Sequence, residues 1–147
     1  ASGDFDPAIA DFSKAIESDS QFSEAYLNRG NAWNDKGELD HAISDYSNAI
    51  ALKSGFVEAY FNRGLARYAK GSIDPAIDDF SKTIEIQPEL ADAYYYRALA
   101  WGKKWEVSGG IPSYLMRALS DVKKAFKIEP GNKTYQNLIL QLEAELR

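Results

Sequence analysis

The sequence contains no cysteine and a single histidine, and both scarcities exclude kinds of functional site. Without cysteine the chain can form no disulfide, no thiolate zinc site and no cysteine nucleophile, although this does not identify a compartment. His41 has no further ligands gathered near it at the spacing that a metal site requires. We therefore interpret His41 as a solvated surface residue and expect no bound metal.

Long apolar runs and an excess of positive charge are missing too. No apolar stretch approaches the roughly 18 residues of a membrane span, and no signal peptide is visible. The formal net charge of −5 argues against wholesale binding to nucleic acid. Charge is nevertheless uneven, because residues 1–101 carry 17 acidic and 9 basic side chains, whereas residues 102–133 carry 3 and 7. We expect a protein partner rather than nucleic acid or a membrane interior.

Signatures of catalysis are also absent. The sequence shows no nucleotide-binding loop, no serine elbow and no histidine-based nucleophile pair. Asp78 and Asp79 are adjacent, and neighbouring residues on a helix point apart, so they do not form a carboxylate pair for acid–base work. We predict that this segment is not an enzyme and holds no cofactor.

What the sequence has in place of these features is repetition. "YLNRGNAWNDKGELDHAISDYSNAI" begins at Tyr26, and "YFNRGLARYAKGSIDPAIDDFSKTI" begins 34 residues later at Tyr60. An alanine marks each copy of the second half of the phrase: Ala8, Ala42, Ala76 and Ala118. The last step is 42 residues long, which indicates an insertion of eight residues.

Each unit has the pattern of two helices. Apolar residues recur at helical spacing on both sides of a glycine such as Gly37. Gly30 and Gly64 would let the two helices approach closely, with an aromatic ring filling the adjoining space. Asp6-Pro7 and Asp74-Pro75 predict an N-cap acid followed by proline in the first turn.

These units resemble the tetratricopeptide repeat, and the resemblance covers nearly the whole chain. The residues that carry it are Tyr26, Arg29, Gly30, Trp33, Ala42 and Tyr46, then Tyr60, Arg63, Gly64, Arg67, Ala76, Phe80 and Pro88, then Tyr94, Arg97, Ala98, Trp101, Ala118, Val122 and Pro130. Ser54 stands in place of the first late proline, and Arg replaces the leucine of the family. The resemblance implies an all-α, right-handed solenoid of helix-turn-helix repeats.

The expected division of the chain follows from the repeats. Residues 1–22 hold the second helix of a unit, units span 23–56, 57–90 and 91–132, and residues 133–147 form a capping helix. The insertion near 106–113 is predicted to be a loop, either folded back on its own helices or acting as a contact finger. The first helix lacks its partner, so the face with Ala8 and Phe12 should be partly exposed. We expect another chain, a swapped helix or residues outside this segment to cover it.

Two columns of opposite charge recur through the units: Arg29, Arg63 and Arg97, and Asp11, Asp45 and Asp79. One hypothesis is a row of ligand-binding arginines. The favoured one is a structural ladder, in which each arginine meets the aspartate of the preceding unit. Arg29 would then pair with Asp11, Arg63 with Asp45, and Arg97 with Asp79.

The resemblance implies a protein-interaction module whose inner helices line a concave groove. The residues expected to face the groove are Glu24, Leu27, Asn28, Asn31, Asn34, Glu58, Phe61, Asn62, Leu65, Tyr68, Asp92, Tyr95, Tyr96 and Leu99. Aromatic anchors, asparagine amides and an acidic rim favour a peptide or helix with apolar or aromatic and basic residues.

One subfamily clamps the carboxylate tails of heat-shock chaperones. Asn31 and Asn62 match its two asparagines, but Leu27, Asp92 and Tyr96 stand where its cations would be, so we predict a different ligand. Two other functions stay open, namely self-assembly through the ends of the solenoid and a regulatory part of a larger enzyme.

Overall fold

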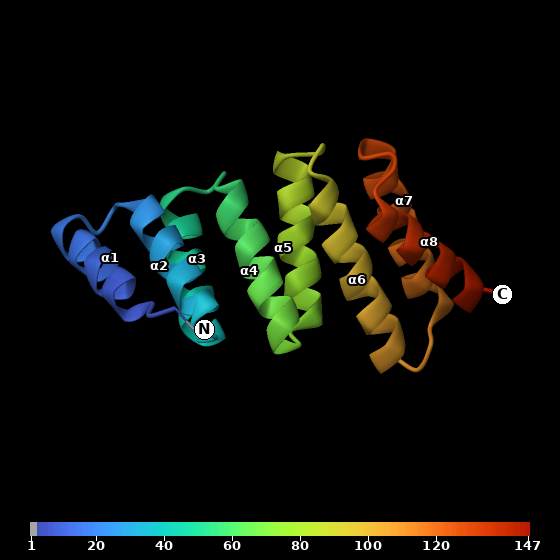
Figure 1. Cartoon of the computed structure of the whole chain (residues 1–147), viewed down its shortest axis with the longest axis horizontal. Coiled ribbons are helices and arrows are strands. Elements are labelled where there is room, and N and C mark those ends of the chain that lie inside the picture. Colours follow the sequence, from blue (N-terminus) through green and yellow to red (C-terminus); the bar gives the residue numbers. More distant parts are fainter. Residues whose placement is uncertain (1–2) are drawn as a thin grey trace.

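The structure is a computed structural model that describes residues 3–147 as a row of helices along a curved stack (Figure 1). The helices are α1 (Asp6–Ser18), α2 (Ser23–Asp35), α3 (Leu39–Leu52), α4 (Val57–Lys70), α5 (Ile73–Ile86), α6 (Ala91–Val107), α7 (Pro112–Ile128) and α8 (Lys133–Glu145). Residues 3–147 contain no strand, which confirms the predicted all-α solenoid. None of the helices in this range has both the length and the apolar composition to cross a bilayer.

The helices pack in pairs, and the pairs stack on one another. α2 packs on α3, α4 on α5 and α6 on α7, while α3 joins α4 and α5 joins α6. α1 precedes the first pair and α8 covers α7. α2 also touches α4 and α4 touches α6, with no comparable contact of α3 with α5 or of α5 with α7 among the described residues. The inside of the curve is therefore formed by α2, α4 and α6.

Glycine allows the two helices of a pair to approach closely. A Cβ atom on Gly64 would lie 2.7 Å from Cε1 of Phe80, and one on Gly30 would lie 2.8 Å from Cε1 of Tyr46. Real Cβ contacts of this length do not occur, so each aromatic ring fits only because glycine has no Cβ atom at that position. Tyr46 and Phe80 are 1% and 0% exposed as a result.

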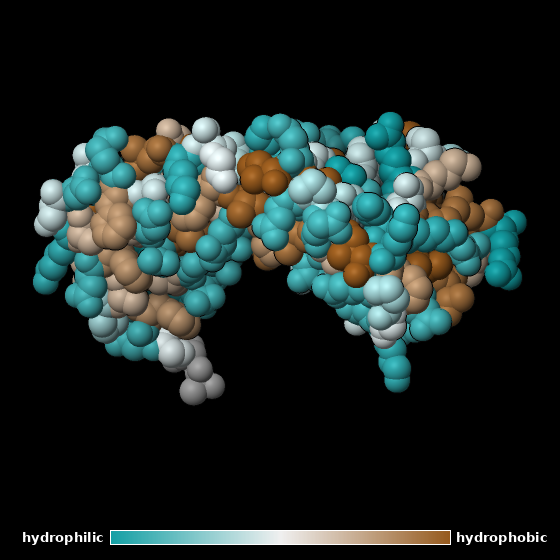
Figure 2. All heavy atoms as spheres, turned by 90° about the horizontal axis from the view of Figure 1, so that it is seen from above, coloured by the Kyte–Doolittle hydropathy of each residue, from teal (hydrophilic) through white to brown (hydrophobic). Residues whose placement is uncertain are grey.

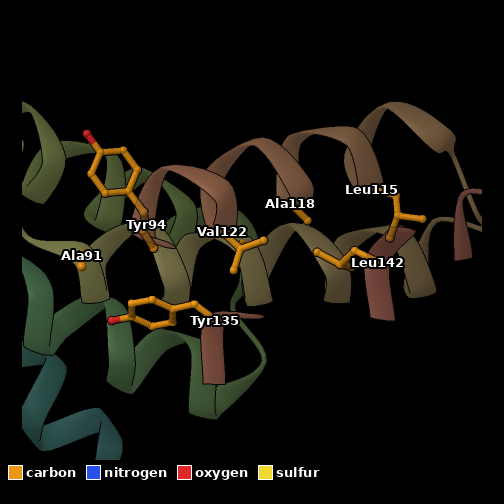
Figure 3. Packing of buried hydrophobic residues seen from close by; sticks show 9 residues of the cluster. Ala91, Tyr94, Leu115, Ala118, Val122, Tyr135 and Leu142 are labelled. Atoms are coloured by element: carbon orange, nitrogen blue, oxygen red, sulfur yellow. The ribbon is translucent and has the colours of Figure 1, made fainter. Parts of the chain in front are cut away.

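α8 closes the C-terminal end of the stack. Tyr135 and Leu142 are buried in a cluster with Val122 and Ala118 of α7, as Figure 3 shows. Leu138 and Ile139 pack against the same cluster. The helix has the only side-chain cap among the eight, since Asn132 accepts hydrogen bonds from the backbone N–H groups of Thr134 and Tyr135.

The N-terminal end is less covered. Ala8 and Phe12 of α1 are half-buried, whereas their counterparts in the next two units are buried: Ala42 and Ala76 for Ala8, and Tyr46 and Phe80 for Phe12. This difference is the partial exposure that the unpartnered first helix predicted.

The predicted long loop is wrong in its extent. α6 and α7 each have 17 residues, against 14 in each of α4 and α5, and only residues 108–111 connect them. The insertion thus lengthens both helices. Nothing in the segment before Ser108 breaks a helix, and Pro112 stands at the start of α7, where proline is well tolerated.

The arginine–aspartate ladder exists, but its predicted pairing is wrong. Arg63 donates from Nε and Nη2 to Asp79 of its own unit at 3.0 and 2.7 Å, and not to Asp45. Arg29 bonds in the same way to Asp45 instead of Asp11, and Arg97 to Asp121 instead of Asp79.

The link to the preceding unit runs through serine. Nη1 of Arg29, Arg63 and Arg97 donates to Oγ of Ser13, Ser47 and Ser81 at 3.1, 2.9 and 3.0 Å. One arginine therefore joins two carboxylate oxygens in its own pair and one hydroxyl in the pair before. Asp11 lies exposed on α1 and has no arginine partner in the described chain.

The predicted N-cap acids have a different role. The residues that precede α1 and α5 are Phe5 and Ser72, and neither helix has a side-chain cap. Asp6 and Asp74 instead form ion pairs with Lys36 and Lys104 at 2.7 and 2.6 Å. Asp40 and Lys70, at the equivalent positions of the repeat, form a third pair. A second, exposed ladder thus joins successive units, although exposed pairs contribute little each.

The buried ladder predicts unequal effects for two aspartates. Asp79→Ala should lower the free energy of unfolding by about 3–5 kcal/mol, because it leaves Arg63 and Arg67 without their carboxylate. Asp11→Ala should change it by less than about 0.5 kcal/mol. Urea unfolding followed by circular dichroism measures both, and equal losses would contradict the observed pairing.

Two helical glycines should respond to alanine with opposite signs. Gly64→Ala should destabilise the chain by about 1–3 kcal/mol, because the new methyl group would collide with Phe80. Gly102→Ala should stabilise it by about 0.5–1 kcal/mol, since its Cβ would meet no atom within 4 Å and alanine is the better helix former. Thermal unfolding of the two variants checks the signs, and destabilisation by both would show that α6 needs its glycine for packing.

Candidate functional site

The inside of the curve is the candidate binding surface. Figure 2 shows the molecule as an arch with a hollow on one side, between its N-terminal and C-terminal ends. The predicted groove residues lie on α2, α4 and α6, which form the inside of that curve. Glu24, Asn28, Glu58 and Asp92 are exposed, Leu27 is buried, and the others are half-buried: Asn31, Asn34, Phe61, Asn62, Leu65, Tyr68, Tyr95, Tyr96 and Leu99.

Leu27 is not available as a surface residue. It is 4% exposed and belongs to the cluster that contains Tyr46 and Phe56. The interpretation of Leu27 as an inward-facing binding residue is therefore corrected, because its position on α2 directs the side chain into the core.

Two of the asparagines are bound to the protein itself. Oδ1 of Asn31 accepts from the Tyr46 hydroxyl at 2.8 Å and from Nδ2 of Asn62 at 3.0 Å. Burial raises the pKa of Tyr46 above its usual value, so this phenol stays a donor. The Asn31 side chain joins α2, α3 and α4, whereas Asn28, one turn earlier, is exposed and forms no side-chain hydrogen bond within residues 3–147.

Aromatic rings continue across α4, α6 and α8. Phe61 and Tyr96 meet edge to face with their centroids 5.8 Å apart, and Tyr95 lies 5.2 Å from both Tyr96 and Tyr135. Phe80 of α5 lies behind them, 6.0 Å from Phe61. These rings pack on one another and still keep part of their surface open, because Phe61, Tyr95 and Tyr96 are only half-buried.

The acidic rim is partly committed to internal contacts. Asp92 accepts a hydrogen bond from the Tyr135 hydroxyl at 2.7 Å, and Glu24 accepts from Ser23 at 2.9 Å. Hydrogen bonds from the Glu24 backbone and from the Ser23 hydroxyl lower the pKa of Glu24. Glu58 is exposed and forms no ion pair in the described residues, which leaves its full charge facing solvent.

The structure also contains a pocket that the sequence did not predict. It has a volume of about 350 Å³ and lies between α6 and α8. Of the expected groove residues only Tyr68 and Leu99 line it, and the other walls come from the end of α6, from α7 and from α8. The glycine at 102, in a column that otherwise holds Asn34 and Tyr68, is the sequence feature that could have indicated it.

Comparisons with known proteins agree with this architecture. A family model described as TPR repeat matches residues 30–71 and 64–104. A search of curated proteins gives no match. A crystal structure of MamA is 27% identical with a TM-score of 0.86, and the alignment covers 99% of this chain and 81% of that one.

Two further solved structures are similar. The TPR domain of OM64 from Arabidopsis is 25% identical with a TM-score of 0.74, over 83% of this chain and 94% of that one. The first TPR of Spaghetti (RPAP3), bound to the HSP90 peptide SRMEEVD, has a TM-score of 0.77 over 87% of this chain and 95% of that one. At 21% identity, this last likeness concerns the fold alone.

The asparagine network predicts that Asn31 is structural. Asn31→Ala should destabilise the chain by about 1–3 kcal/mol, because the buried Tyr46 hydroxyl loses its acceptor. Asn28→Ala, on the same helix, should change the stability by less than about 0.5 kcal/mol. Chemical unfolding of the two variants tests this. If Asn31→Ala leaves the stability unchanged, the Asn31 side chain is not structural and is free to contact a ligand.

Proposed function

Because the chain belongs to the tetratricopeptide-repeat family, whose members are protein–protein interaction modules, we propose that it holds an extended peptide or a helix of another protein in the hollow of the arch. The observation that carries the proposal is the strip of half-open aromatic rings beside uncommitted polar groups inside the curve. Aromatic side chains offer much apolar contact area at a low entropic cost, and such residues dominate binding energies at protein interfaces.

Charge favours a basic partner segment. Glu24, Glu58 and Asp92 lie exposed at the start of α2, α4 and α6, so their carboxylates recur from one inner helix to the next. The partner should therefore place lysine or arginine near these carboxylates and apolar or aromatic groups on Phe61 and Tyr95.

An acidic tail does not suit this surface. At the positions where the resemblance to chaperone-tail clamps would require cations, the chain has buried Leu27, acidic Asp92 and Tyr96. A carboxylate there would find no charge-assisted hydrogen bond and would be repelled by the rim. We infer a ligand chemistry opposite to that of the peptide SRMEEVD bound by the first TPR of RPAP3.

Self-assembly is a second candidate, favoured by one observation. The face of α1 with Ala8 and Phe12 is only half-buried, and Phe22 is 45% exposed nearby in the chain. A second copy could cover this apolar surface, and light scattering over a range of protein concentrations would detect it.

A charge-reversal pair tests the groove. Peptides selected from a random library on the full chain, then synthesised, serve as probes, and we expect basic residues beside aromatic or aliphatic ones. Glu58→Lys should weaken their binding by roughly three- to tenfold, because it reverses an exposed charge in the groove. Asp78→Lys makes the same change of net charge on the outer helix α5 and should leave binding unaltered.

Isothermal titration calorimetry measures both affinities. Equal weakening by the two variants would mean that net charge, and not the groove, attracts the peptide. Selection of acidic peptides would contradict the proposed ligand chemistry directly.

A further inference from the structure

The pocket between α6 and α8 is a distinct hollow at the C-terminal end of the groove. Ala98, Leu115 and Leu142 are buried beneath it, and Leu138 and Trp105 stand at its sides. Lys103, Glu106, Gln141 and Glu145 add polar groups to its lining. The pocket is thus an apolar hollow with polar groups around it, which is the usual composition of a ligand site.

Gly102 has no packing reason to be glycine. It lies inside α6, where glycine costs about 0.5–1 kcal/mol relative to alanine. Gly30 and Gly64 are explained by the rings that touch them, but a Cβ on Gly102 would meet no atom within 4 Å. Its backbone also has no left-handed φ that would require glycine.

The position of Gly102 explains what the glycine does. In the repeat register it follows Asn34 and Tyr68, so every other inner helix places a side chain there. Gly102 lines the pocket together with Leu99 and Lys103, so a side chain at position 102 would enter the pocket. A residue of ordinary size at this place would fill the pocket, and the glycine that keeps the pocket open makes the helix less stable.

The insertion and the capping helix complete the hollow. Trp105 and Glu106 belong to the part of α6 that the eight-residue insertion adds, and Leu115, which corresponds to Ile73 of α5, lies in the first turn of α7. Gln141 and Glu145 come from α8. The earlier units lack this extension, so the pocket is a property of the last pair and its cap.

We propose that this pocket receives one large apolar or aromatic side chain of the bound segment, next to a lysine or arginine of the same segment. The inference rests on the proposed groove function and specifies where its anchor lies. A volume of about 350 Å³ is at the lower end of the range for ligand sites, which suits a single side chain and is too small for a helix.

The charges around the pocket select the neighbouring residue of the segment. Lys103 forms an ion pair with Glu106 at 2.8 Å, so these two charges compensate each other. Glu145 forms no ion pair in the described residues and leaves one negative charge at the edge. A cation next to the anchor would meet this charge, whereas a carboxylate would be repelled.

A second hollow continues the path of the segment. It also measures about 350 Å³, and it shares Tyr68 and Lys103 with the first while reaching Gly71 and Ile73. Tyr68 is half-buried between the two, and its burial raises the pKa of its hydroxyl. The segment can therefore leave the anchor pocket over Tyr68 and continue toward the turn between α4 and α5.

Three blocked dipeptides serve as probes of the anchor: N-acetyl-Trp-Lys-amide, N-acetyl-Ala-Lys-amide and N-acetyl-Trp-Glu-amide. Amide shifts in ¹H–¹⁵N spectra of the full chain report where each one binds. Trp-Lys should shift the amides of Gly102, Gln141 and Leu142 and bind more tightly than either of the others. Ala-Lys binding equally well would overturn the anchor, and equal binding of Trp-Glu would overturn the selection for a cation.

Filling the pocket is the decisive variant. Gly102→Phe should weaken Trp-Lys binding at least tenfold, because its ring occupies the hollow. Gly102→Ala adds a single methyl group to the hollow, and it should weaken binding much less than Gly102→Phe does. Should Gly102→Phe fail to fold, Gly102→Leu replaces it. Full affinity in a folded, filled variant would overturn the proposal.

Glu145→Gln tests the charge separately. It should reduce the preference for Trp-Lys over Trp-Glu by about two- to fivefold, the range expected for an exposed charge pair. An unchanged preference would show that Glu145 does not contact the cation.

The library peptides distinguish this inference from the groove itself. If Glu58→Lys weakens them and Gly102→Phe does not, the groove function holds and the anchor pocket is wrong. If only Gly102→Phe weakens them, the pocket binds the partner and the groove proposal is wrong.

Discussion

The rest of the stack depends on the ion pair that a partly buried arginine forms with an aspartate in each helix pair. Arg63 is 15% exposed and meets an aspartate that is 3% exposed, so its removal from water is compensated only if the geometry is kept. The planar guanidinium can bind two carboxylate oxygens in parallel and still direct Nη1 to Ser47 of the preceding pair. Each pair is thereby fixed both internally and relative to its neighbour.

The arginine also fixes what the groove displays. On a helix with 3.6 residues per turn, Asn31 and Asn34 lie about 200° and 140° around the axis from Arg29. Glu24 falls in the same sector, opposite the arginine. Because the arginine is tied to the outer helix of its own pair and to the one before, this sector must turn to the inside of the curve. The inner surface of the arch is therefore a consequence of a contact made on the other side of α2.

The sequence predicted that each arginine binds an aspartate, but it did not predict which aspartate. A period of 34 residues places an aspartate both in the same unit as each arginine and in the unit before, and spacing alone favours neither. The structure selects Asp79 for Arg63 because the two helices of a pair are antiparallel and in contact through Gly64 and Phe80. The two-helix units and the role of Gly64 were predicted because each depends on local pattern alone.

Other features could not be predicted, since they depend on several elements at once. Gly109 and Gly110 indicated a loop, but the preceding residues up to Val107 continue the helix when α8 and α7 supply a surface for it to pack on. Asn31 was expected to be free for a ligand, yet its oxygen accepts from residues of two other helices. The pocket needs the missing side chain of Gly102, the extension of α6 and the cap together. No single segment of the sequence contains all three.

Comparison of the units separates the residues that stacking requires from the residues that can differ between units. The arginine and its aspartate recur in all three pairs, each arginine also donates to a serine of the preceding unit, and Arg97 and Asp121 keep their contact across the eight-residue insertion. The column of Asn34, Tyr68 and Gly102 changes at every step, although the backbone there is helical each time. A position under the same backbone constraint in three copies, yet with three different side chains, is not determined by the fold. Its variation runs from a polar amide through an aromatic ring to an open hollow, along the direction in which a bound segment would lie. The three copies thus share one backbone and differ in the side chain at this position, and the pocket beside Gly102 is where we propose that a partner inserts a side chain.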